Sequence, residues 1–279
     1  MIAYINGRFI PKDKIAISPE DRGFLFADGA YEVICSYNGN LFKIDEHLER
    51  LRRSLGELRI EGPPINHLRT VAEGLIERNE LSDVHAMIYI QVTRGAAPRK
   101  HIFPEKATPA TVYANASAFQ PLYKERENGI TVITLPDIRW NRCDIKSVAL
   151  LPNVLACQQA KERGAVEAVF IRNGFITEGS HTNFCAVFDD QLFTHPANNH
   201  ILGGITRQVV LGLCTQLGVP FKESPILENE LKNADEAMVL GTTYEILPVV
   251  QVDDWQVGNG TPGPITRELQ HAYRRATTS

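Results

Sequence analysis

The sequence of 279 residues lacks several patterns that would assign it to a protein class at once. It has only five cysteines, widely spread and without a CxxC pair, which argues against a disulfide framework and a thiolate zinc site. We therefore expect reduced thiols and a cytoplasmic location. No apolar run reaches the roughly 18 residues that a membrane span needs. The N-terminal stretch also lacks the apolar core of a secretory signal, so we expect no membrane partner.

An excess of basic charge and the short histidine motifs of metal sites are also missing. The chain carries 29 Lys and Arg against 33 Asp and Glu, a formal net charge of -4, so nucleic acid is not indicated as a partner. There is no HExxH or HxxxH, and we predict no metal site. The GxSxG and SxxK motifs of serine nucleophiles are absent as well, so serine-based hydrolysis has no support.

What the sequence does contain is a succession of strand and helix patterns in two halves. The first half has hairpin signals at Asn-Gly pairs, a helix from the predicted N-cap Asp45, and a second helix near 66–80. The second half has a helix near 153–163, clustered strands over 166–194 and a helix at about 205–217. We predict a mixed α/β (α+β) fold with domains at 1–118 and 130–279, joined by a polar, aperiodic linker at 119–129.

Lys146 differs from most of the ten lysines because a nearly continuous apolar run, Val148 to Leu151, follows it. Poor hydration of the head group favours a neutral and reactive amine, which suits Schiff-base and proton-transfer chemistry. The alternative is a lysine at the end of a strand whose stem packs against apolar neighbours while its head reaches water. The segment alone leaves both interpretations open.

Two glycines precede a clear helical pattern in "ILGGITRQVVLGLC" (201–214). The free N–H groups of Ile205 and Thr206 at such a helix start would face an anion such as a phosphate. Thr242, just after a predicted strand, adds a hydroxyl. The segment lacks the lysine of an NTP-binding loop and does not match GxGxxG. A glycine-rich turn into a packed helix explains it equally well.

Two further segments place charged side chains where they would bind a small molecule. Glu178 ends a short strand, and either lies on the surface or holds a positive ring nitrogen in a cleft, where Gly179 permits close approach. Arg99 and His101 lie two residues apart in a proline-bounded loop and can point the same way in extended chain. A guanidinium there can bind a carboxylate in two-point fashion, and a solvated basic loop is the alternative.

Taken together, these segments resemble the pyridoxal-phosphate-dependent transaminases of fold type IV, in the branched-chain aminotransferase-like family, and most closely the D-amino acid transaminases. The resemblance covers nearly the whole chain, and its motifs are long, ordered and widely separated. They are "DRGFLFADGAYEV", "EHLERL", "VTRGAAPRKHIFP", "DIRWNRCDIKSVALLPNVLA", "TEGSHTNFCAV", "THPANNHILGGITR" and "TTYEILPV". The family fold implies a smaller N-terminal α/β domain and a larger, pseudo-barrel-like C-terminal domain.

The resemblance also implies the cofactor, pyridoxal 5'-phosphate, and a role for each candidate residue. It implies that Lys146 holds the cofactor covalently and performs catalysis, and that Glu178 pairs with the pyridine nitrogen. The residues implied to bind the cofactor phosphate are Arg50, Ile205, Thr206 and Thr242, and those implied to bind the substrate α-carboxylate are Tyr31, Arg99 and His101. In the family the loop that carries the arginine and the histidine reaches over from a partner subunit, so we expect a homodimer.

The implied reaction moves the amino group of D-amino acids, such as D-alanine or D-glutamate, to a 2-oxo acid such as 2-oxoglutarate in a ping-pong cycle. A branched-chain L-amino acid transaminase or an aminodeoxychorismate lyase would keep the same lysine and glutamate. A non-catalytic phosphate-ligand-binding protein would use only the glycine-rich segment. The run Ser180-His181-Thr182 and Tyr244 depart from the family pattern and would reshape the side-chain pocket.

Overall fold

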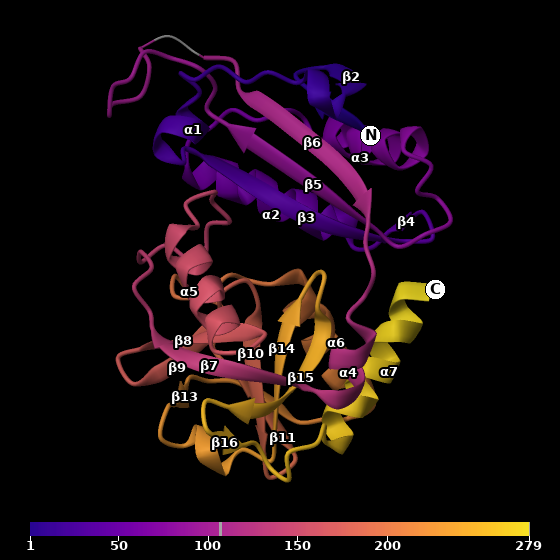
Figure 1. Cartoon of the computed structure of the whole chain (residues 1–279), viewed down its shortest axis with the longest axis vertical. Helices are drawn as coiled ribbons and strands as arrows, with labels where there is room; N and C mark the ends of the chain where they lie inside the picture. The colour runs from indigo at the N-terminus through magenta and orange to yellow at the C-terminus, as the bar shows by residue number, and fades with distance from the viewer. Residues whose placement is uncertain (106–107, 279) are drawn as a thin grey trace. The chain divides into compact units, whose positions relative to one another are not determined.

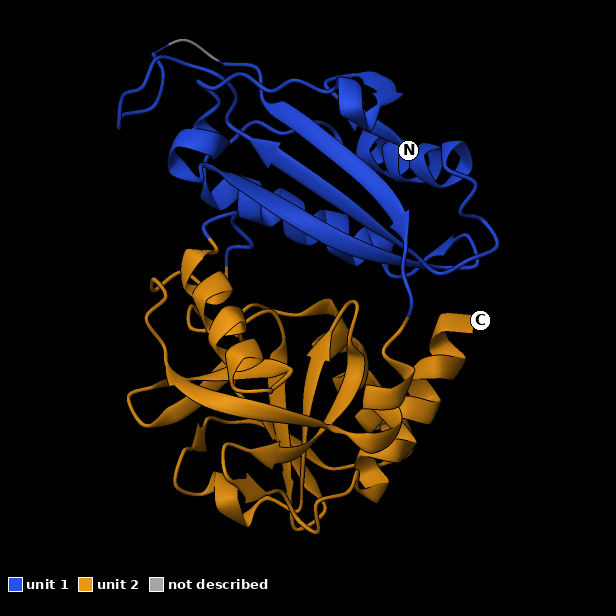
Figure 2. Ribbon diagram, viewed as in Figure 1, with its two compact units in different colours: residues 1–120, 145–149 blue, residues 121–144, 150–279 orange. Residues whose placement is uncertain are grey.

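The computed structural model describes residues 1–105 and 108–278, and the chain divides into two compact units (Figures 1 and 2). Unit 1 contains residues 1–120 and 145–149, and unit 2 contains residues 121–144 and 150–279. Both units combine helices with strands, so the predicted mixed fold class is confirmed. The predicted domain limits, 1–118, 119–129 and 130–279, stay a prediction.

Unit 1 is built on one antiparallel sheet of six strands (Figure 1). Across the sheet the strands are β2 (Arg8–Pro11), β1 (Ile2–Ile5), β6 (Thr111–Ala118), β5 (Ala86–Thr93), β3 (Gly29–Tyr37) and β4 (Asn40–Leu41). Along β5 buried side chains alternate with partly exposed ones, which is the period that one covered face dictates. The helices of this unit are α1 (Arg22–Phe26), α2 (Ile44–Glu57), α3 (Ile65–Arg78) and the short 3-10 helix η1 (Lys12–Lys14).

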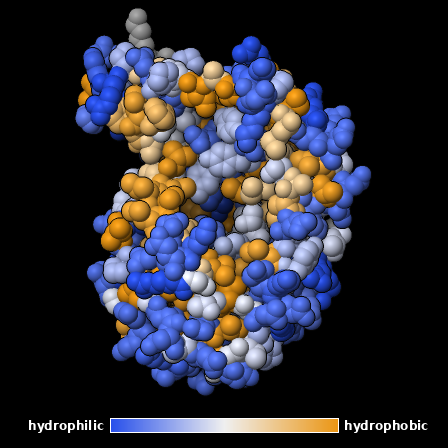
Figure 3. Space-filling view, viewed as in Figure 1, coloured by the Kyte–Doolittle hydropathy of each residue, from blue (hydrophilic) through white to orange (hydrophobic). Residues whose placement is uncertain are grey.

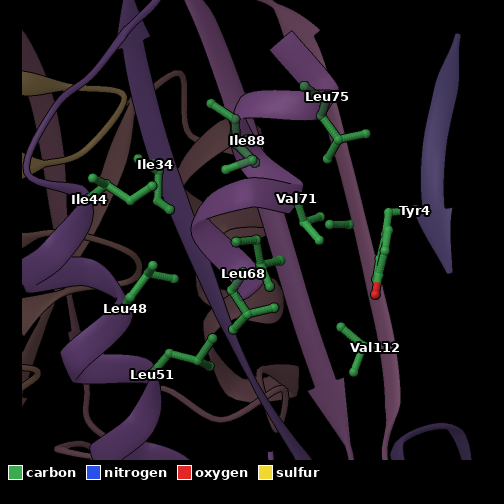
Figure 4. Packing of buried hydrophobic residues seen from close by; sticks show 14 of the residues in the cluster. Tyr4, Ile34, Ile44, Leu48, Leu51, Leu68, Val71, Leu75, Ile88 and Val112 are labelled. Atoms are coloured by element: carbon green, nitrogen blue, oxygen red, sulfur yellow. The ribbon is translucent and has the colours of Figure 1, made fainter. Parts of the chain in front are cut away.

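The core of unit 1 lies between this sheet and helices α2 and α3 (Figure 4). Leu48 and Leu51 on α2, and Leu68 and Leu75 on α3, recur at helical spacing and are 2% exposed or less. They pack with Ile88 of β5 and other sheet residues in one cluster. Truncating one such leucine to alanine would cost about 2–5 kcal/mol. This packing makes the sheet a rigid support for the side chains of β3, among them Tyr31 and Glu32.

Unit 2 is a ten-stranded sheet that closes on itself. The strands are β7 (Ile130–Pro136), β8 (Glu167–Arg172), β9 (Phe175–Gly179), β10 (Asn183–Phe188), β11 (Gln191–Thr194), β12 (Phe221–Glu223), β13 (Ile226–Leu227), β14 (Glu236–Gly241), β15 (Glu245–Val252) and β16 (Trp255–Gln256). The order β10-β14-β15-β7-β8-β9 returns to β10 through the pair Asn183 and Glu178, which makes a closed barrel. The predicted pseudo-barrel is thereby confirmed.

Helices α4 (Tyr123–Asn128), α5 (Leu151–Glu162), α6 (Ile205–Leu217) and α7 (Pro264–Thr278), with the 3-10 helix η2 (Leu231–Asn233), accompany this barrel. Apolar strand residues fill its main core, and a second cluster joins α5 to β7 and β8 through Ala160 and Phe170. Among the described residues, no helix combines the length and the apolar character that crossing a membrane requires.

Two local predictions differ from the structure. The sequence predicts Asp45 as an N-cap, but α2 begins at Ile44, and its N-cap is Lys43 in the left-handed conformation with φ 56°. Asp45 therefore lies in the first turn, where its charge still complements the helix dipole. The sequence also predicts an irregular linker at 119–129, but this segment contains α4, a six-residue helix without a buried residue. Such a short helix leaves no apolar periodicity in the sequence.

Candidate functional site

Lys146 lies in the short segment 145–149 that belongs to unit 1 and runs beside β3. The backbone N–H of Tyr31 donates to the Lys146 carbonyl at 3.1 Å, and the N–H of Val148 donates to the Gly29 carbonyl at 3.0 Å. The N–H of Lys146 itself donates to the Ser54 hydroxyl of α2 at 3.2 Å. The backbone of the lysine is thus held by the sheet on one side and a helix on the other.

The structure brings the side chains of Lys146 and Tyr31 together. The Lys146 Nζ lies 4.4 Å from the centre of the Tyr31 ring, within the range of a cation–π contact. Tyr31 in turn stacks on Tyr89 of β5 with 5.7 Å between ring centres. Burial raises the pKa of Tyr89 to about 12, so its hydroxyl stays neutral in this stack. Lys146 is half-buried, and its amine rests on an aromatic face.

Arg50 belongs to a buried three-residue cluster in unit 1. Its Nε donates to Glu32 Oε1 at 2.7 Å, and a terminal nitrogen donates to Glu32 Oε2 at 2.9 Å. The Nδ1 of His47 lies 2.8 Å from the same Oε2. Arg50 and His47 lie one turn apart on α2, and Glu32 faces them from β3. The arginine predicted to bind phosphate is therefore fixed in direction by a carboxylate to which the sequence assigned no role.

Charge in this cluster is set by two opposing effects. Burial raises the pKa of Glu32, but the Arg50 guanidinium and the His47 contact outweigh it and lower that pKa to about 2. Burial lowers the pKa of His47 in spite of the neighbouring Glu32 carboxylate. At neutral pH the cluster is therefore an Arg⁺–Glu⁻ pair with an uncharged imidazole.

Glu178 lies in unit 2, at the residue pair that closes the barrel. It is 4% exposed, and three donors hold it in place. A terminal nitrogen of Arg139 donates to Oε1 at 2.5 Å, while the Asn183 amide and the Leu202 backbone N–H each donate to Oε2 at 3.0 Å. The surface interpretation of Glu178 is therefore wrong. The three donors hold this carboxylate in one orientation at the point where β9 pairs with β10.

Burial raises the pKa of Glu178 to about 6, and the Arg139 guanidinium opposes that rise. Arg139 is itself fixed by Asp137, whose two oxygens accept from its Nε and a terminal nitrogen at 2.9 Å each. Arg172 pairs with the same Asp137 at 3.1 Å. Glu178 is thus anionic at neutral pH, and a further positive group beside it would stabilise the anion. A protonated ring nitrogen would be such a group.

The start of α6 lies near Glu178 and is open to an anion. Its N-cap is Gly204, with no side-chain cap among the described residues, so the first N–H groups, including those of Ile205 and Thr206, are not capped. A Cβ at Gly204 would overlap the Oδ1 of Asn183, the residue that also holds Glu178. Thr242 follows β14, whose Leu240 pairs with Asn183. One asparagine therefore connects the carboxylate, the helix start and the strand end.

Arg99 and His101 are both exposed on a loop of unit 1, and the ring of Phe26 contacts both of them. The Arg99 guanidinium carbon is 5.2 Å from the Phe26 ring centre, and the His101 ring centre is 5.5 Å from it. The base of this loop is fixed by Asp28, which accepts from Arg22 at 2.8 Å and from Arg94 at 2.7 Å. The two predicted carboxylate-binding side chains therefore share one aromatic support.

The predicted site residues divide between the two units. Unit 1 carries Lys146, Tyr31, Arg50, Arg99 and His101, and unit 2 carries Glu178, Ile205, Thr206 and Thr242. The residues that orient these side chains were not predicted, and they are Glu32, His47, Arg139 and Asn183. All four lie inside motifs quoted above, Glu32 in "DRGFLFADGAYEV", His47 in "EHLERL", Arg139 in "DIRWNRCDIKSVALLPNVLA" and Asn183 in "TEGSHTNFCAV", so the motifs contained the signal.

Comparison with known proteins gives concordant matches along the chain. A family model described as "Amino-transferase class IV" matches residues 29–252. The D-alanine aminotransferase of Staphylococcus haemolyticus is 44% identical, and the match covers 98% of this chain and 96% of that protein. The D-alanine aminotransferase of Bacillus licheniformis is 42% identical, and the match covers 100% of this chain and 98% of that protein. The solved branched-chain amino acid aminotransferase of Escherichia coli has a TM-score of 0.91 at 26% identity, covering 98% of this chain and 93% of that chain.

Proposed function

This chain belongs to the class IV amino-transferase family, and we propose that it moves the amino group of D-amino acids such as D-alanine to a 2-oxo acid such as 2-oxoglutarate. The observation that carries the D-specific assignment is the difference in identity between relatives. D-alanine aminotransferases are 41–44% identical over nearly the full length, whereas the solved branched-chain aminotransferase above is 26% identical. The exposed Arg99 and His101 supply the carboxylate-binding pair that this assignment needs.

The residues present fit pyridoxal 5'-phosphate, which this family uses. Its phosphate matches the uncapped N-terminus of α6, where Gly204 leaves the backbone accessible. A protonated ring nitrogen matches the buried carboxylate of Glu178, whose raised pKa indicates that a positive partner would stabilise it. A primary amine on a fixed backbone, Lys146, matches the aldehyde. We infer that Lys146 binds the cofactor covalently and that Arg50 and Thr242 complete its phosphate contacts.

The bound cofactor supplies an aldehyde for amine attachment and a ring that withdraws electrons from the substrate Cα. Lys146 would hold the cofactor covalently through its Nζ, and the same amine, on its fixed backbone, would accept and return the Cα proton of the substrate. Glu178 keeps the ring nitrogen protonated, because an adjacent anion favours the charged form. Arg99 and His101 fix the carboxylate, so only one enantiomer presents its Cα hydrogen to Lys146. Tyr31 supports both the amine and the substrate.

The test is to follow the long-wavelength absorption of the cofactor-loaded protein while adding D-alanine or L-leucine without an acceptor. We expect D-alanine to remove this absorption and L-leucine to leave it. Removal by L-leucine alone would favour the branched-chain alternative, and continuous pyruvate release from added aminodeoxychorismate without an acceptor would favour the lyase. Borohydride reduction should attach pyridoxyl to Lys146, and the Lys146→Ala variant should take up none covalently. Cofactor attached elsewhere would refute the assignment.

We also propose that the protein is a homodimer, because α5 exposes an apolar stripe. Leu151, Val154 and Leu155 lie at positions i, i+3 and i+4 and are 69%, 58% and 56% exposed. Figure 3 shows apolar atoms gathered in the region where Figure 1 places α5. A monomer rarely leaves such a stripe uncovered, so a second copy of the chain is the partner we expect there. The predicted cytoplasmic location rests on the sequence and stays a prediction.

The dimer has two direct tests. Leu155→Lys should convert the sedimenting species from two chains to one, whereas Gln216→Lys, at an exposed position of α6 away from this stripe, should leave it unchanged. If the Arg99 loop serves the partner's site, mixing Lys146→Ala and Arg99→Ala proteins under exchange conditions should restore activity at D-alanine concentrations far below the raised KM of the Arg99 variant, where neither protein alone is active. A mixture that stays inactive would mean that each chain uses its own loop.

A further inference from the structure

Three metal-ligand side chains from separate elements of unit 2 meet outside the residues assigned above. Cys157 comes from α5, Glu167 from β8, and His181 from the turn between β9 and β10. One ligand atom of each, the Cys157 Sγ, a Glu167 oxygen and a His181 ring nitrogen, lie within 4.8 Å of one another. A thiol, an imidazole and a carboxylate are three donor types that zinc sites combine.

Two of the three separations between these atoms are close to those around a tetrahedral ion. The His181 Nδ1 lies 3.7 Å from the Cys157 Sγ and 3.1 Å from the Glu167 Oε2. With Zn–S of about 2.3 Å and Zn–N or Zn–O of about 2.0–2.1 Å, tetrahedral angles require about 3.5 Å between S and N and about 3.3 Å between N and O. The third separation, between the Cys157 Sγ and the Glu167 oxygen, is at most 4.8 Å, and the Ser180 hydroxyl, which lies 2.8 Å from that Sγ and 3.1 Å from the His181 Nδ1, would have to turn aside as an ion enters.

The carboxylate is held as a metal ligand needs to be. Glu167 is fully buried, and its Oε1 accepts from the Ala168 N–H at 2.8 Å, the Ser180 N–H at 3.1 Å and the Ser180 hydroxyl. The Thr182 hydroxyl donates to Oε2 at 2.9 Å. These donors fix both oxygens, and outer contacts of this kind orient ligands in metal sites.

The other two ligands are accessible and oriented. The side chain of His181 is 41% exposed, so an ion and a fourth ligand from water have a path to the cluster. The Tyr244 ring packs edge-on against the His181 ring with 4.7 Å between centres, which limits rotation of the imidazole. Hydrogen bonding to His181, with a further contact from Ser180, lowers the pKa of Cys157 against the opposing effect of burial.

We propose that Cys157, Glu167 and His181 form a binding site for a borderline-soft divalent metal ion of the zinc class, with water as the fourth ligand. The donor set decides the class of ion. Magnesium and calcium ions require several oxygen ligands, and this cluster offers one carboxylate, whereas thiolate and imidazole select zinc-like ions. The sequence predicted no metal site, because residues so far apart in the chain form no short motif. His181 is also one of the residues that depart from the family pattern.

The test measures zinc binding to chelator-treated, cofactor-loaded protein by calorimetry and equilibrium dialysis. We expect one tightly bound equivalent in the wild-type protein and an affinity at least about 100-fold weaker in Cys157→Ser and in His181→Gln, since a lost ligand should cost no less than a lost outer contact. Matched controls are Cys214→Ser, a buried thiol on α6, and His271→Gln, an exposed histidine on α7, which should bind zinc as the wild type does.

Cadmium-113 NMR of the loaded protein identifies the donors independently of affinity. One resonance in the range of a single thiolate ligand is expected, and it should disappear in Cys157→Ser. Unfolding midpoints of the metal-free variants show whether each has folded. The proposal is overturned if both Cys157 and His181 variants fold and bind zinc like the wild type. It is also overturned if the controls lose binding equally, or if the wild type binds no equivalent.

Discussion

The carboxylate of Glu32 binds the guanidinium of Arg50 at two points, with Nε–Oε1 and N–Oε2 distances of 2.7 and 2.9 Å inside unit 1. Both side chains are nearly excluded from solvent, at 0% and 7% exposed. A buried pair of this kind fixes direction more than it adds stability, because its desolvation cost offsets much of its attraction. We infer that Glu32 orients Arg50 for its proposed contact with the cofactor phosphate.

The same pair predicts a loss of stability in acid. The pKa of Glu32 is lowered from 4.5 to about 2 on folding, so its contribution is complete above pH 4.5 and is lost as the pH falls through 2. A shift of this size corresponds to about 3 kcal/mol of unfolding free energy. His47, whose pKa is also lowered, acts in the same direction below pH 6.5. Urea unfolding at pH 6, 4.5 and 3 measures the effect.

Glu32→Gln separates this contribution from the general effect of acid. The variant leaves the Arg50 charge buried without its partner, which should cost about 3–5 kcal/mol near neutral pH, and its deficit should shrink as the pH falls. Glu49→Gln, which removes an exposed partner of Arg52, is the control and should leave the unfolding midpoint unchanged. An equal deficit at pH 6 and pH 3 would contradict the assigned pKa of Glu32.

Gly204→Ala tests the helix start as a phosphate site. The added Cβ would overlap the Asn183 Oδ1, so the helix start or the asparagine must move, at a cost of about 1–3 kcal/mol. We expect weaker retention of the cofactor, measured by dialysis followed by absorbance. Gly203→Ala is a matched control, since nothing lies within 4 Å of a Cβ there. Equal retention by both variants would remove α6 from the cofactor site.

Arg139→Met tests the electrostatic support of Glu178. Losing the guanidinium removes the largest effect that opposes burial, so the pKa of Glu178 should rise further above about 6. A charged hydrogen bond contributes about 1.5–3 kcal/mol, which corresponds to a rise of about one to two pH units. The acidic limb of the pH profile of kcat should therefore move to higher pH. Arg142→Met, which removes a more exposed ion pair, should leave that limb in place. A profile unchanged in shape would mean that Glu178 does not carry the needed charge.

Arg99→Ala tests the predicted carboxylate contact. A bidentate charged contact contributes about 1.5–3 kcal/mol, so KM for D-alanine should rise about 10- to 100-fold while the cofactor absorption stays the same. Lys100→Ala removes a neighbouring positive charge and serves as the control. Loss of the cofactor with an unchanged KM would show that Arg99 has been assigned to the wrong ligand.

Periodicity in the sequence sufficed for the larger elements. Two glycines before a long apolar pattern predict a helix at 205–217, and α6 spans Ile205–Leu217. The limits of α2 were less accurate because Lys43 adopts a left-handed cap that its residue type does not favour. Helix α4 has no buried residue and therefore left no signal.

The residues that support the site lie inside the motifs, but their supporting roles were not predicted, for a different reason. Glu32 and Arg139 are ordinary charged residues in their segments, and their function depends on burial and on partners 18 and 39 residues away. Cys157, Glu167 and His181 likewise meet only through the barrel. Lys146 became a candidate because its apolar neighbours are adjacent in sequence, but that local pattern left two interpretations open, and its role was assigned from the family resemblance.

Because residues 145–149 belong to unit 1, no single cut divides this chain into two self-sufficient proteins. A fragment ending at residue 120 would keep the pairing of β3 with β5 but would lose the segment 145–149 beside the start of β3, and with it the amine at 146. A fragment beginning at residue 121 would carry that amine on a strand segment with nothing to pair with. Any ancestral or engineered exchange of halves must therefore preserve the backbone pairing between Tyr31 and Lys146. This pairing restricts where two related chains can be recombined, in addition to the restriction that the two hydrophobic cores impose.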